Sequence, residues 1–293
     1  MKIADLHEGN NIESIVSSYF KKISSIHTNT DGSIDLTGNL VLTNNIDNLP
    51  FTINKLTGNL SFAFSENVTT LKGCPKIIKG DLSVNQTNIS SFEGAPDIVT
   101  GTVRCDGNIN LISLNGFPKS VEKFSFIRCE ALKSTNGIQD SKIKTIRINS
   151  PIIIEIIVPV NVSNITLSLP ITTLPVLPKI LNGTLHCASC KLNNLIGAPE
   201  KVNGNFILDN TPLTSLEGMP KVINGDFLCS GTRLTPEDFK YALLSQIKGV
   251  FQCYDHPDSI SNFINRFQSL SFEERKSKIF SALTKLKSWN ETM

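Results

Sequence analysis

Residues 204–224 read GNFILDNTPLTSLEGMPKVIN, and Gly225 then opens a closely similar phrase 21 residues after Gly204. The same kind of opening glycine recurs along the chain, at Gly80, Gly101, Gly183, Gly204 and Gly225. A second marker, an apolar residue followed by x-Gly-x-Pro, keeps nearly the same spacing, with its glycines at Gly73, Gly94, Gly116, Gly197 and Gly218. Two independent markers therefore define a repeat of about 21 residues.

Each repeat begins with a pattern typical of a short β-strand. Apolar residues stand two and four places after the opening glycine, as Phe206 and Leu208 do, which predicts a strand with one buried face. The Gly-x-Pro step is expected to turn the chain, because glycine can take a positive φ and proline needs no ladder partner there. A unit this small cannot bury its apolar side alone. The predicted fold is therefore a mainly β repeat solenoid with one short parallel strand per repeat of about 21 residues.

The repeat resembles a known family. Phe206, Leu208, Thr211 and Leu213 follow the leucine-rich-repeat pattern. Residues 214–227, TSLEGMPKVINGDF, and residues 30–40, TDGSIDLTGNL, are similar to leucine-rich-repeat proteins encoded by tailed, T4-like bacteriophages. The resemblance covers roughly residues 25–255 and implies a leucine-rich-repeat fold and a viral origin, without an assigned activity. It departs from the family at the asparagine-ladder position, which here carries Thr87, Cys190, Thr211 or Thr232, and in residues 145–182, which lack the glycines.

Both ends of the array are expected to carry caps, because its first and last apolar layers would otherwise be exposed. Residues 1–35 are predicted to form an N-terminal cap, a helix followed by a hairpin at Asp31-Gly32. Residues 36–255 are predicted to form the solenoid, and residues 256–293 a C-terminal helical cap.

The C-terminal region contains two helix-start signals. Thr235-Pro236 predicts a helix whose first residue is Pro236, and Ser271-x-x-Glu274 is a capping box that starts the last helix. The terminal helices also carry a basic run, which we interpret as the wetted side of an amphipathic helix: Arg266, Arg275, Lys276, Lys278, Lys285 and Lys287.

Composition limits the classes of partner. The chain has 28 Lys and Arg against 26 Asp and Glu, a formal net charge of +2, whereas proteins held mainly by phosphates usually carry a clear basic excess. The longest apolar stretch, residues 152–158, contains Glu155 and is far shorter than the ~20 residues of a membrane span. The N-terminus shows no secretory pattern. We expect a cytoplasmic protein, in the host cell if it is viral, with neither a membrane nor a small-molecule partner.

Cysteine does not indicate catalysis or metal binding. Cys187-x-x-Cys190 beside His186 is only half of a tetrahedral zinc site. Cys105, Cys187, Cys229 and Cys253 all occupy the same inward strand position, which predicts core packing. Cys253-Tyr254-Asp255 resembles the Cys-x-Asp motif of bacterial leucine-rich-repeat ubiquitin ligases, but only 40 residues follow Cys253, too few for a catalytic domain of ordinary size. The sequence thus predicts no catalytic residue, no cofactor and no metal.

The strand face that points away from the core gives the candidate partner-binding residues. If Gly137 is the counterpart of Gly94 and Gly116, the repeat that begins at residue 123 directs two phenylalanines to solvent beside charged residues. The predicted surface then contains Arg104, Asp106, Phe124, Phe126, Arg128, Arg147 and His186. The alternative is a slip of one residue that turns both phenylalanines inward. Burial energy favours the slip, because the glycine-based register would bury Ser125 while exposing Phe124 and Phe126.

The leading functional hypothesis is a non-enzymatic protein-protein interaction module, a phage protein that binds a host or phage protein in host takeover or counter-defence. Aromatic and arginine side chains on a rigid sheet are typical of interface hot spots. The alternative is an accessory protein of phage DNA replication or nucleic-acid metabolism that binds nucleic acid through Arg104, Arg128, Arg147 and the terminal helices. A ubiquitin-ligase-like effector is the third.

Overall fold

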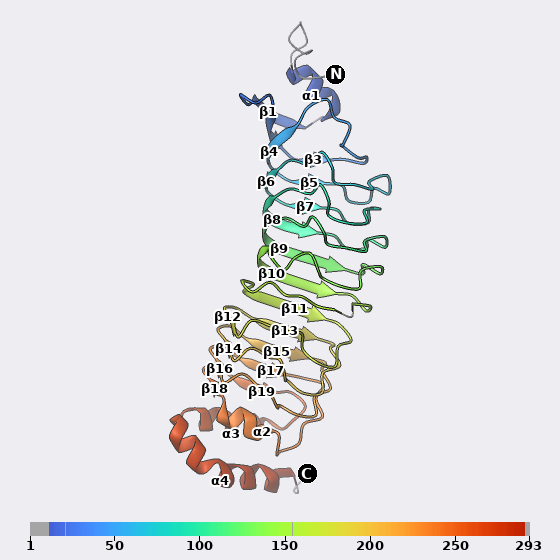
Figure 1. Ribbon diagram of the computed structural model, residues 1–293. Helices are drawn as coiled ribbons and strands as arrows, with labels where there is room; N and C mark the ends of the chain where they lie inside the picture. The colour runs from blue at the N-terminus through green and yellow to red at the C-terminus, as the bar shows by residue number, and fades with distance from the viewer. Residues whose placement is uncertain (1–11, 21, 154, 291–293) are drawn as a thin grey trace. The chain divides into compact units, whose positions relative to one another are not determined.

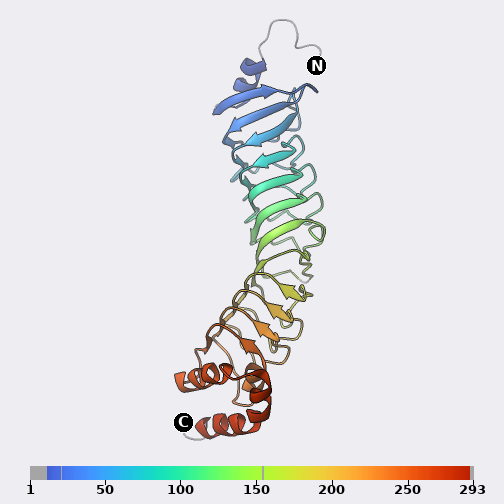
Figure 2. The same cartoon turned by 90° about the vertical axis from the view of Figure 1, so that its left-hand side faces the viewer.

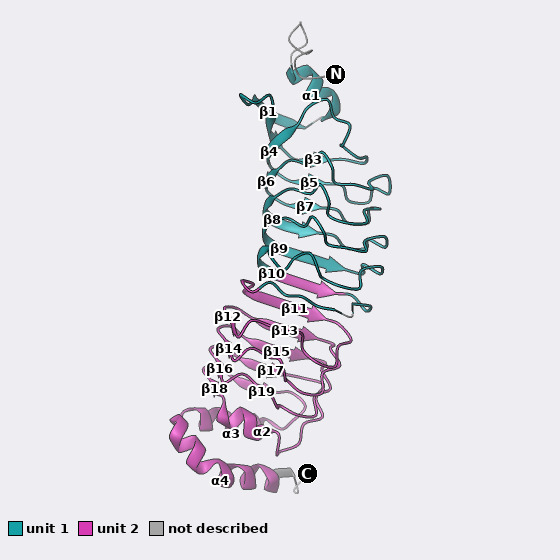
Figure 3. Cartoon of the chain, in the orientation of Figure 1, with its two compact units in different colours: residues 1–145, 150–159 teal, residues 146–149, 160–293 magenta. Residues whose placement is uncertain are grey.

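The computed structural model describes residues 12–20, 22–153 and 155–290, so residues 1–11 of the predicted N-terminal cap lie outside the described part. The chain is a mainly β solenoid of parallel strands with a few helices (Figure 1). It divides into two compact units: unit 1 contains residues 1–145 and 150–159, and unit 2 contains residues 146–149 and 160–293 (Figure 3). Strand β10 (Lys142–Asn149) contributes residues to both units.

Unit 1 starts with helix α1 (Ile12–Tyr19) and an antiparallel hairpin of β1 (Ile23–Thr28) and β2 (Ile34–Gly38), which confirms the predicted turn at Asp31-Gly32. From β2 onward the strands pair in parallel, in two rows that merge in β8. The first row is β2, β4 (Ile53–Thr57), β6 (Ile77–Lys79), β8 (Ile98–Arg104) and β9 (Ser120–Ile127). The second row is β3 (Leu40–Val41), β5 (Leu60–Ser61), β7 (Leu82–Ser83) and β8.

Unit 2 also contains two rows of parallel strands, followed by helices (Figures 1 and 2). One row is β11 (Asn164–Ser168), β13 (Leu185–Ala188), β15 (Phe206–Asp209), β17 (Phe227–Cys229) and β19 (Phe251–Cys253). The other is β12 (Ile180–Leu181), β14 (Lys201–Val202), β16 (Val222–Ile223) and β18 (Gln246–Ile247). The helices are α2 (Phe239–Leu244), α3 (Asp258–Gln268) and α4 (Phe272–Asn290).

The prediction of one strand per repeat was too low, because repeats of unit 2 contain two short strands, such as β14 and β15. Gly204 lies between these two strands and interrupts the extended run. A Cβ atom on Gly204 would lie 2.7 Å from the carbonyl carbon of Gly183 in the preceding repeat, so only glycine permits this backbone approach. The opening glycines are therefore stacking positions.

The glycines of the Gly-x-Pro turns have the other role that the sequence predicts. Their φ angles lie between 82° and 94°, in the left-handed region that favours glycine, at Gly73, Gly94, Gly116, Gly197 and Gly218. The turn prediction is confirmed at each of these positions.

The inward strand positions form a continuous core within each unit. The four cysteines predicted to pack there are fully buried, which confirms that prediction. In unit 2, Phe206, Phe227 and Phe251 pair in register along β15, β17 and β19, with ring centroids 5.6 and 5.4 Å apart. β11 keeps this register although its repeat has no opening glycine. Ile165 of β11 pairs with Leu185 of β13, which in turn pairs with Phe206.

The glycine-based register around residue 123 is wrong. Phe124 and Phe126 are 1% and 0% exposed, and Ser125, instead of Phe126, pairs with Arg104 on the outer face. Phe124 packs against Phe117 with ring centroids 4.4 Å apart. β9 therefore adopts the register shifted by one residue, because this register buries two phenyl rings that the glycine-based register would expose.

Two predictions for the C-terminal region also need correction. α2 begins at Phe239 rather than at Pro236, because residues 236–238 form a separate turn, in which the Asp238 N–H donates to the Thr235 carbonyl oxygen at 3.0 Å. The Asp238 carboxylate accepts hydrogen bonds from the Thr235 N–H and hydroxyl, at 2.8 Å each. Arg275 is not on a wetted face: it is 3% exposed, and its guanidinium donates to the carbonyl oxygens of Leu243 and Ser245. The capping box is confirmed, since the Ser271 N–H donates to Glu274 Oε2 at 2.9 Å.

Candidate functional site

The outer face of unit 1 is built from residues that alternate with buried ones along the strands. One row of side chains crosses the parallel strands in register: Val41, Ser61, Ser83, Arg104 and Ser125. A second row lies two residues after each member of the first row and, except for Ile127, just beyond the ends of the strands: Thr43, Ala63, Asn85, Asp106 and Ile127. Because most of these side chains are small, the backbone of a partner could approach the sheet closely. We call this surface the unit-1 outer face.

Arg104 is held on the unit-1 outer face by an ion pair. Its guanidinium lies 2.8 Å from the Asp81 carboxylate in the preceding repeat. Burial opposes the charge on Asp81, but the Thr102 N–H and the Arg104 guanidinium outweigh it, so the pKa of Asp81 lies below its ordinary value. In the second row, the Asp106 N–H donates to Asn85 Oδ1 at 2.9 Å. Arg104 and Asp106 are thus fixed parts of this surface.

A corner bounds the unit-1 outer face, and the chain turns there with a left-handed residue in successive repeats. The φ angles are 63° at Phe64, 51° at Gln86, 71° at Gly107 and 57° at Arg128. Unit 2 repeats the corner with Ser189, Asn210 and Gly231. A residue with a Cβ atom pays roughly 1–2 kcal/mol for this conformation. Phe64, Gln86 and Arg128 thus keep large side chains at positions where glycine would be easier to accommodate.

Phe64 is the most unusual member of the corner. Its side chain is 74% exposed, while its N–H donates to the Asn85 carbonyl oxygen at 2.9 Å and fixes the backbone. A bulky residue at positive φ is an outlier, and such residues gather at functional sites. The sequence prediction missed Phe64. A sequence signal for Phe64 was present. Phe64 stands two residues after the inward Phe62, and at the equivalent position the other repeats carry Gln86, Gly107 or Arg128, none of which is aromatic.

The predicted partner-binding residues fall into three settings. Arg104, Asp106 and Arg128 lie on or beside the unit-1 outer face, with Arg128 exposed. Phe124 and Phe126 lie in the core of unit 1. Arg147 and His186 belong to unit 2.

The predicted residues of unit 2 lie on strands. Arg147 is exposed on β10. His186 is half-buried, and its Nε2 atom lies 2.8 Å from the Asp209 carboxylate on the next strand of the row. The neighbouring outer residues in the His186 row are Ile207 and Leu228.

The Cys-x-Asp segment has structural contacts at the end of the β19 row. Cys253 is fully buried and pairs in register with Cys229. Asp255 accepts hydrogen bonds from the Thr232 N–H at 2.8 Å and from the Thr232 hydroxyl at 3.2 Å. Burial lowers the pKa of the adjacent His256, whose ring packs edge-on against Phe239. Within the described residues, no three His, Cys, Asp or Glu side chains are grouped as a metal site requires.

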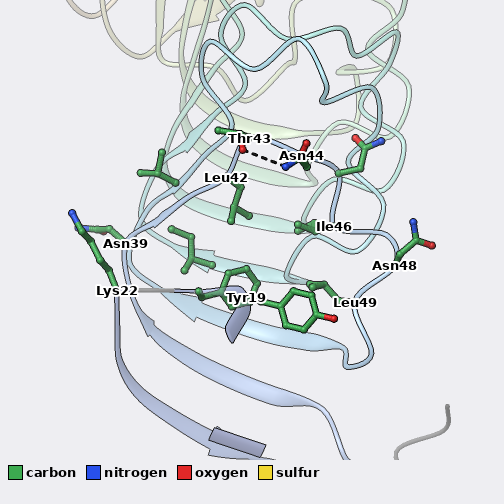
Figure 4. Close-up of a pocket in the computed structure, with 13 residues that line it drawn as sticks. Tyr19, Lys22, Asn39, Leu42, Thr43, Asn44, Ile46, Asn48 and Leu49 are labelled. Carbon is green, nitrogen blue, oxygen red and sulfur yellow. Dashed lines mark hydrogen bonds between the residues drawn. The ribbon is translucent and has the colours of Figure 1, made fainter. Parts of the chain in front are cut away.

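A pocket of about 610 Å³ opens in unit 1 between the end of α1 and the segment that follows β3 (Figure 4). Leu42, Ile46 and Leu49 line its apolar part, and amides such as Asn39 and Asn48 lie around it. The residues that line it include no acidic, histidine or cysteine side chain. The lining therefore provides contacts and amide hydrogen bonds, without the usual acid-base pair of an active site.

In the part of the chain that the structure describes, no helix is long and apolar enough to cross a membrane. Comparisons with protein-family models, with curated proteins and with solved structures found no match to this chain.

Proposed function

We propose that this chain is a non-enzymatic protein-interaction module that binds a protein partner through the unit-1 outer face and its corner, with Phe64 as the anchor. One observation carries the proposal: a phenylalanine three-quarters exposed is held in a left-handed backbone conformation beside a row of small side chains. An aromatic ring that is rigidly presented loses little conformational entropy when a partner covers it.

The surroundings of Phe64 supply the rest of an interface. Arg104 is positioned by Asp81, and Arg128 lies at the same corner as Phe64. Aromatic and arginine side chains dominate interface hot spots, and small neighbours allow close packing around them. A protein surface with an apolar pocket and a carboxylate would complement this arrangement.

The finer assignment is part of the proposal. The repeats are leucine-rich-repeat-like, and the phrase in residues 214–227 supports a phage origin through its resemblance to phage-encoded repeat proteins. The partner would then be a host or phage protein met in the host cytoplasm, in host takeover or counter-defence. This last step rests on analogy between folds.

A capture experiment tests the proposal. Immobilised wild type is exposed to nuclease-treated bacterial lysate beside Phe64→Ser and the matched control Val176→Ser, which removes a similarly exposed apolar side chain from unit 2. We expect one protein to be retained by wild type and by Val176→Ser but lost from Phe64→Ser. Equal retention by all three would show that the anchor is wrong.

Salt separates the protein partner from the nucleic-acid alternative. Binding to nucleic acid through Arg104 and Arg128 should weaken steeply between about 50 and 200 mM salt, because counterions are released from phosphates. An interface centred on Phe64 should lose much less affinity over that range. A steep salt dependence whose log–log slope falls by about one unit with Arg128→Gln, while Phe64→Ser binds normally, would favour the nucleic-acid function.

A further inference from the structure

Helix α4 carries apolar residues on two different sides. Ala282 and Leu286 are buried where α4 packs on α2 and α3. Phe280 lies on the other side and is 84% exposed. A surface helix that packs on one layer needs only one apolar stripe, so the second side is available for another contact.

The exposed side of α4 is organised around Phe280. Glu273 lies seven residues before Phe280 and Lys287 seven residues after it, and all three are exposed. Seven residues make almost two turns of an α-helix, so the three side chains form one stripe. Ser277 and Thr284 flank Phe280 at i−3 and i+4 and are small enough to let another helix approach. The stripe thus has an acid at one end, an aromatic ring in the middle and a base at the other end.

We propose that this stripe binds the same stripe of a second copy of the chain, with the two α4 helices antiparallel and the two Phe280 rings in contact at the two-fold axis. A two-fold interface must be complementary to itself. The stripe meets this requirement, because an antiparallel arrangement centred on Phe280 places Glu273 of each copy opposite Lys287 of the other.

The position of Lys287 supports this occupant. Within the chain, the Lys287 ammonium contacts the Glu237 carboxylate, and both side chains remain at least half exposed. Glu237 thus restrains Lys287 at the end of the stripe while leaving its ammonium accessible to the Glu273 carboxylate of the second copy. Exposed ion pairs contribute little affinity, so the phenyl contact drives association and the charges set the antiparallel direction.

The contact area is modest. α4 contains 19 residues, so the helix is about 28 Å long. Two helices crossing over part of that length form a small interface, which predicts a reversible equilibrium between monomer and dimer.

Sedimentation velocity of the full chain over a concentration series tests the dimer. Wild type is expected to shift from monomer to dimer as concentration rises, and Phe280→Glu to remain a monomer with unchanged thermal stability. Lys278→Glu is the matched control, because residue 278 lies on the opposite side of the helix from Phe280. This variant should dimerise as wild type does. A wild type that stays monomeric at its highest soluble concentration, or a Phe280→Glu variant that still dimerises, would overturn the proposal.

A charge-exchange experiment tests the charge pairing between the two copies. In a parallel dimer Glu273 would face Glu273 and Lys287 would face Lys287 in wild type already, so weaker dimers from each single variant are expected only of the antiparallel arrangement. Glu273→Lys alone and Lys287→Glu alone should each dimerise more weakly than wild type, because like charges then face each other at both ends. A mixture of the two variants should recover dimers, because each end again pairs opposite charges. Failure of the mixture to exceed both single variants would contradict the arrangement. Phe64→Ser should dimerise as wild type does, so failure here is distinguishable from failure of the proposed partner-binding face.

Discussion

Phe64 combines a strained backbone with an exposed ring, an arrangement that favours its proposed role as a binding anchor over a role in stability. Its left-handed conformation costs roughly 1–2 kcal/mol, and its exposed ring recovers little of this cost through burial. Glycine removes the strain but increases the entropy of the unfolded chain. We therefore predict that Phe64→Gly leaves the free energy of unfolding unchanged or raises it by up to about 1 kcal/mol, while partner capture is lost. Urea denaturation measures the first effect, and a loss of stability above that size would mean that the ring is needed for folding.

Arg275 makes the opposite case, a charge that serves the fold. Its guanidinium satisfies the carbonyl oxygens of Leu243 and Ser245 and the side chain of Gln268. Arg275→Met keeps much of the volume but leaves these oxygens without their donor, so we expect the free energy of unfolding to fall by about 2–4 kcal/mol. Lys276→Met, at an exposed neighbouring position, should change it by less than about 0.5 kcal/mol. Equal changes in the unfolding free energy of the two variants, measured by urea denaturation, would contradict a structural role for Arg275.

At the scale of the element, the β1–β2 hairpin should make the N-terminal end of unit 1 sensitive to acid. Burial opposes the charge on Asp35, but Lys55, Asn54 and Asn29 outweigh it and lower the pKa of Asp35 from 3.8 to about 2. A lowered pKa stabilises the fold above pH 3.8, and this contribution disappears as the pH falls from 3.8 to about 2. Because other carboxylates also titrate, the measurement is the difference in unfolding free energy between wild type and Asp35→Asn. We expect this difference to shrink across that window, whereas a constant difference would contradict the role of Asp35.

Elements also mark where sequence reasoning succeeds and where it stops. The strands that follow Gly80, Gly101, Gly183, Gly204 and Gly225 could be predicted, because inward residues at fixed distances from a glycine leave one register that buries them. β9 was misplaced because its repeat lacks an opening glycine, and counting from the turn glycines put its start one residue too late. Only the burial of Phe124 and Phe126 indicates its register. Arg275 was misplaced because a buried arginine and an exposed one occupy the same kind of position in a helical pattern. Its partners, Leu243 and Ser245, lie about 30 residues away and are brought to it only by folding.

For the whole molecule, the repeat explains the fold but leaves the binding site unspecified. The period arises from positions that every repeat must satisfy, such as the stacked glycines. We expect a partner to recognise departures from that pattern, such as the proposed anchor Phe64 at a corner where other repeats carry Gln86 or Gly107. Such departures become visible only after equivalent positions of the repeats are aligned in the structure. For this reason the candidate site was only partly predictable.

The last prediction concerns how far damage spreads through such a stack. A Cβ atom on Gly204 would clash with the backbone of Gly183, so Gly204→Ala should separate β13 from β15, whereas Glu217→Ala, at an exposed position of the same repeat, should not. Because repeats contact only their neighbours, the disturbance should decay with distance along the array. Hydrogen exchange should show protection lost in β13, β15 and β17 of unit 2 and retained in β2 and β4 of unit 1. Equal loss in all five strands would mean that the chain unfolds as one cooperative body, because local stacking energies would then be too strongly coupled to act one repeat at a time.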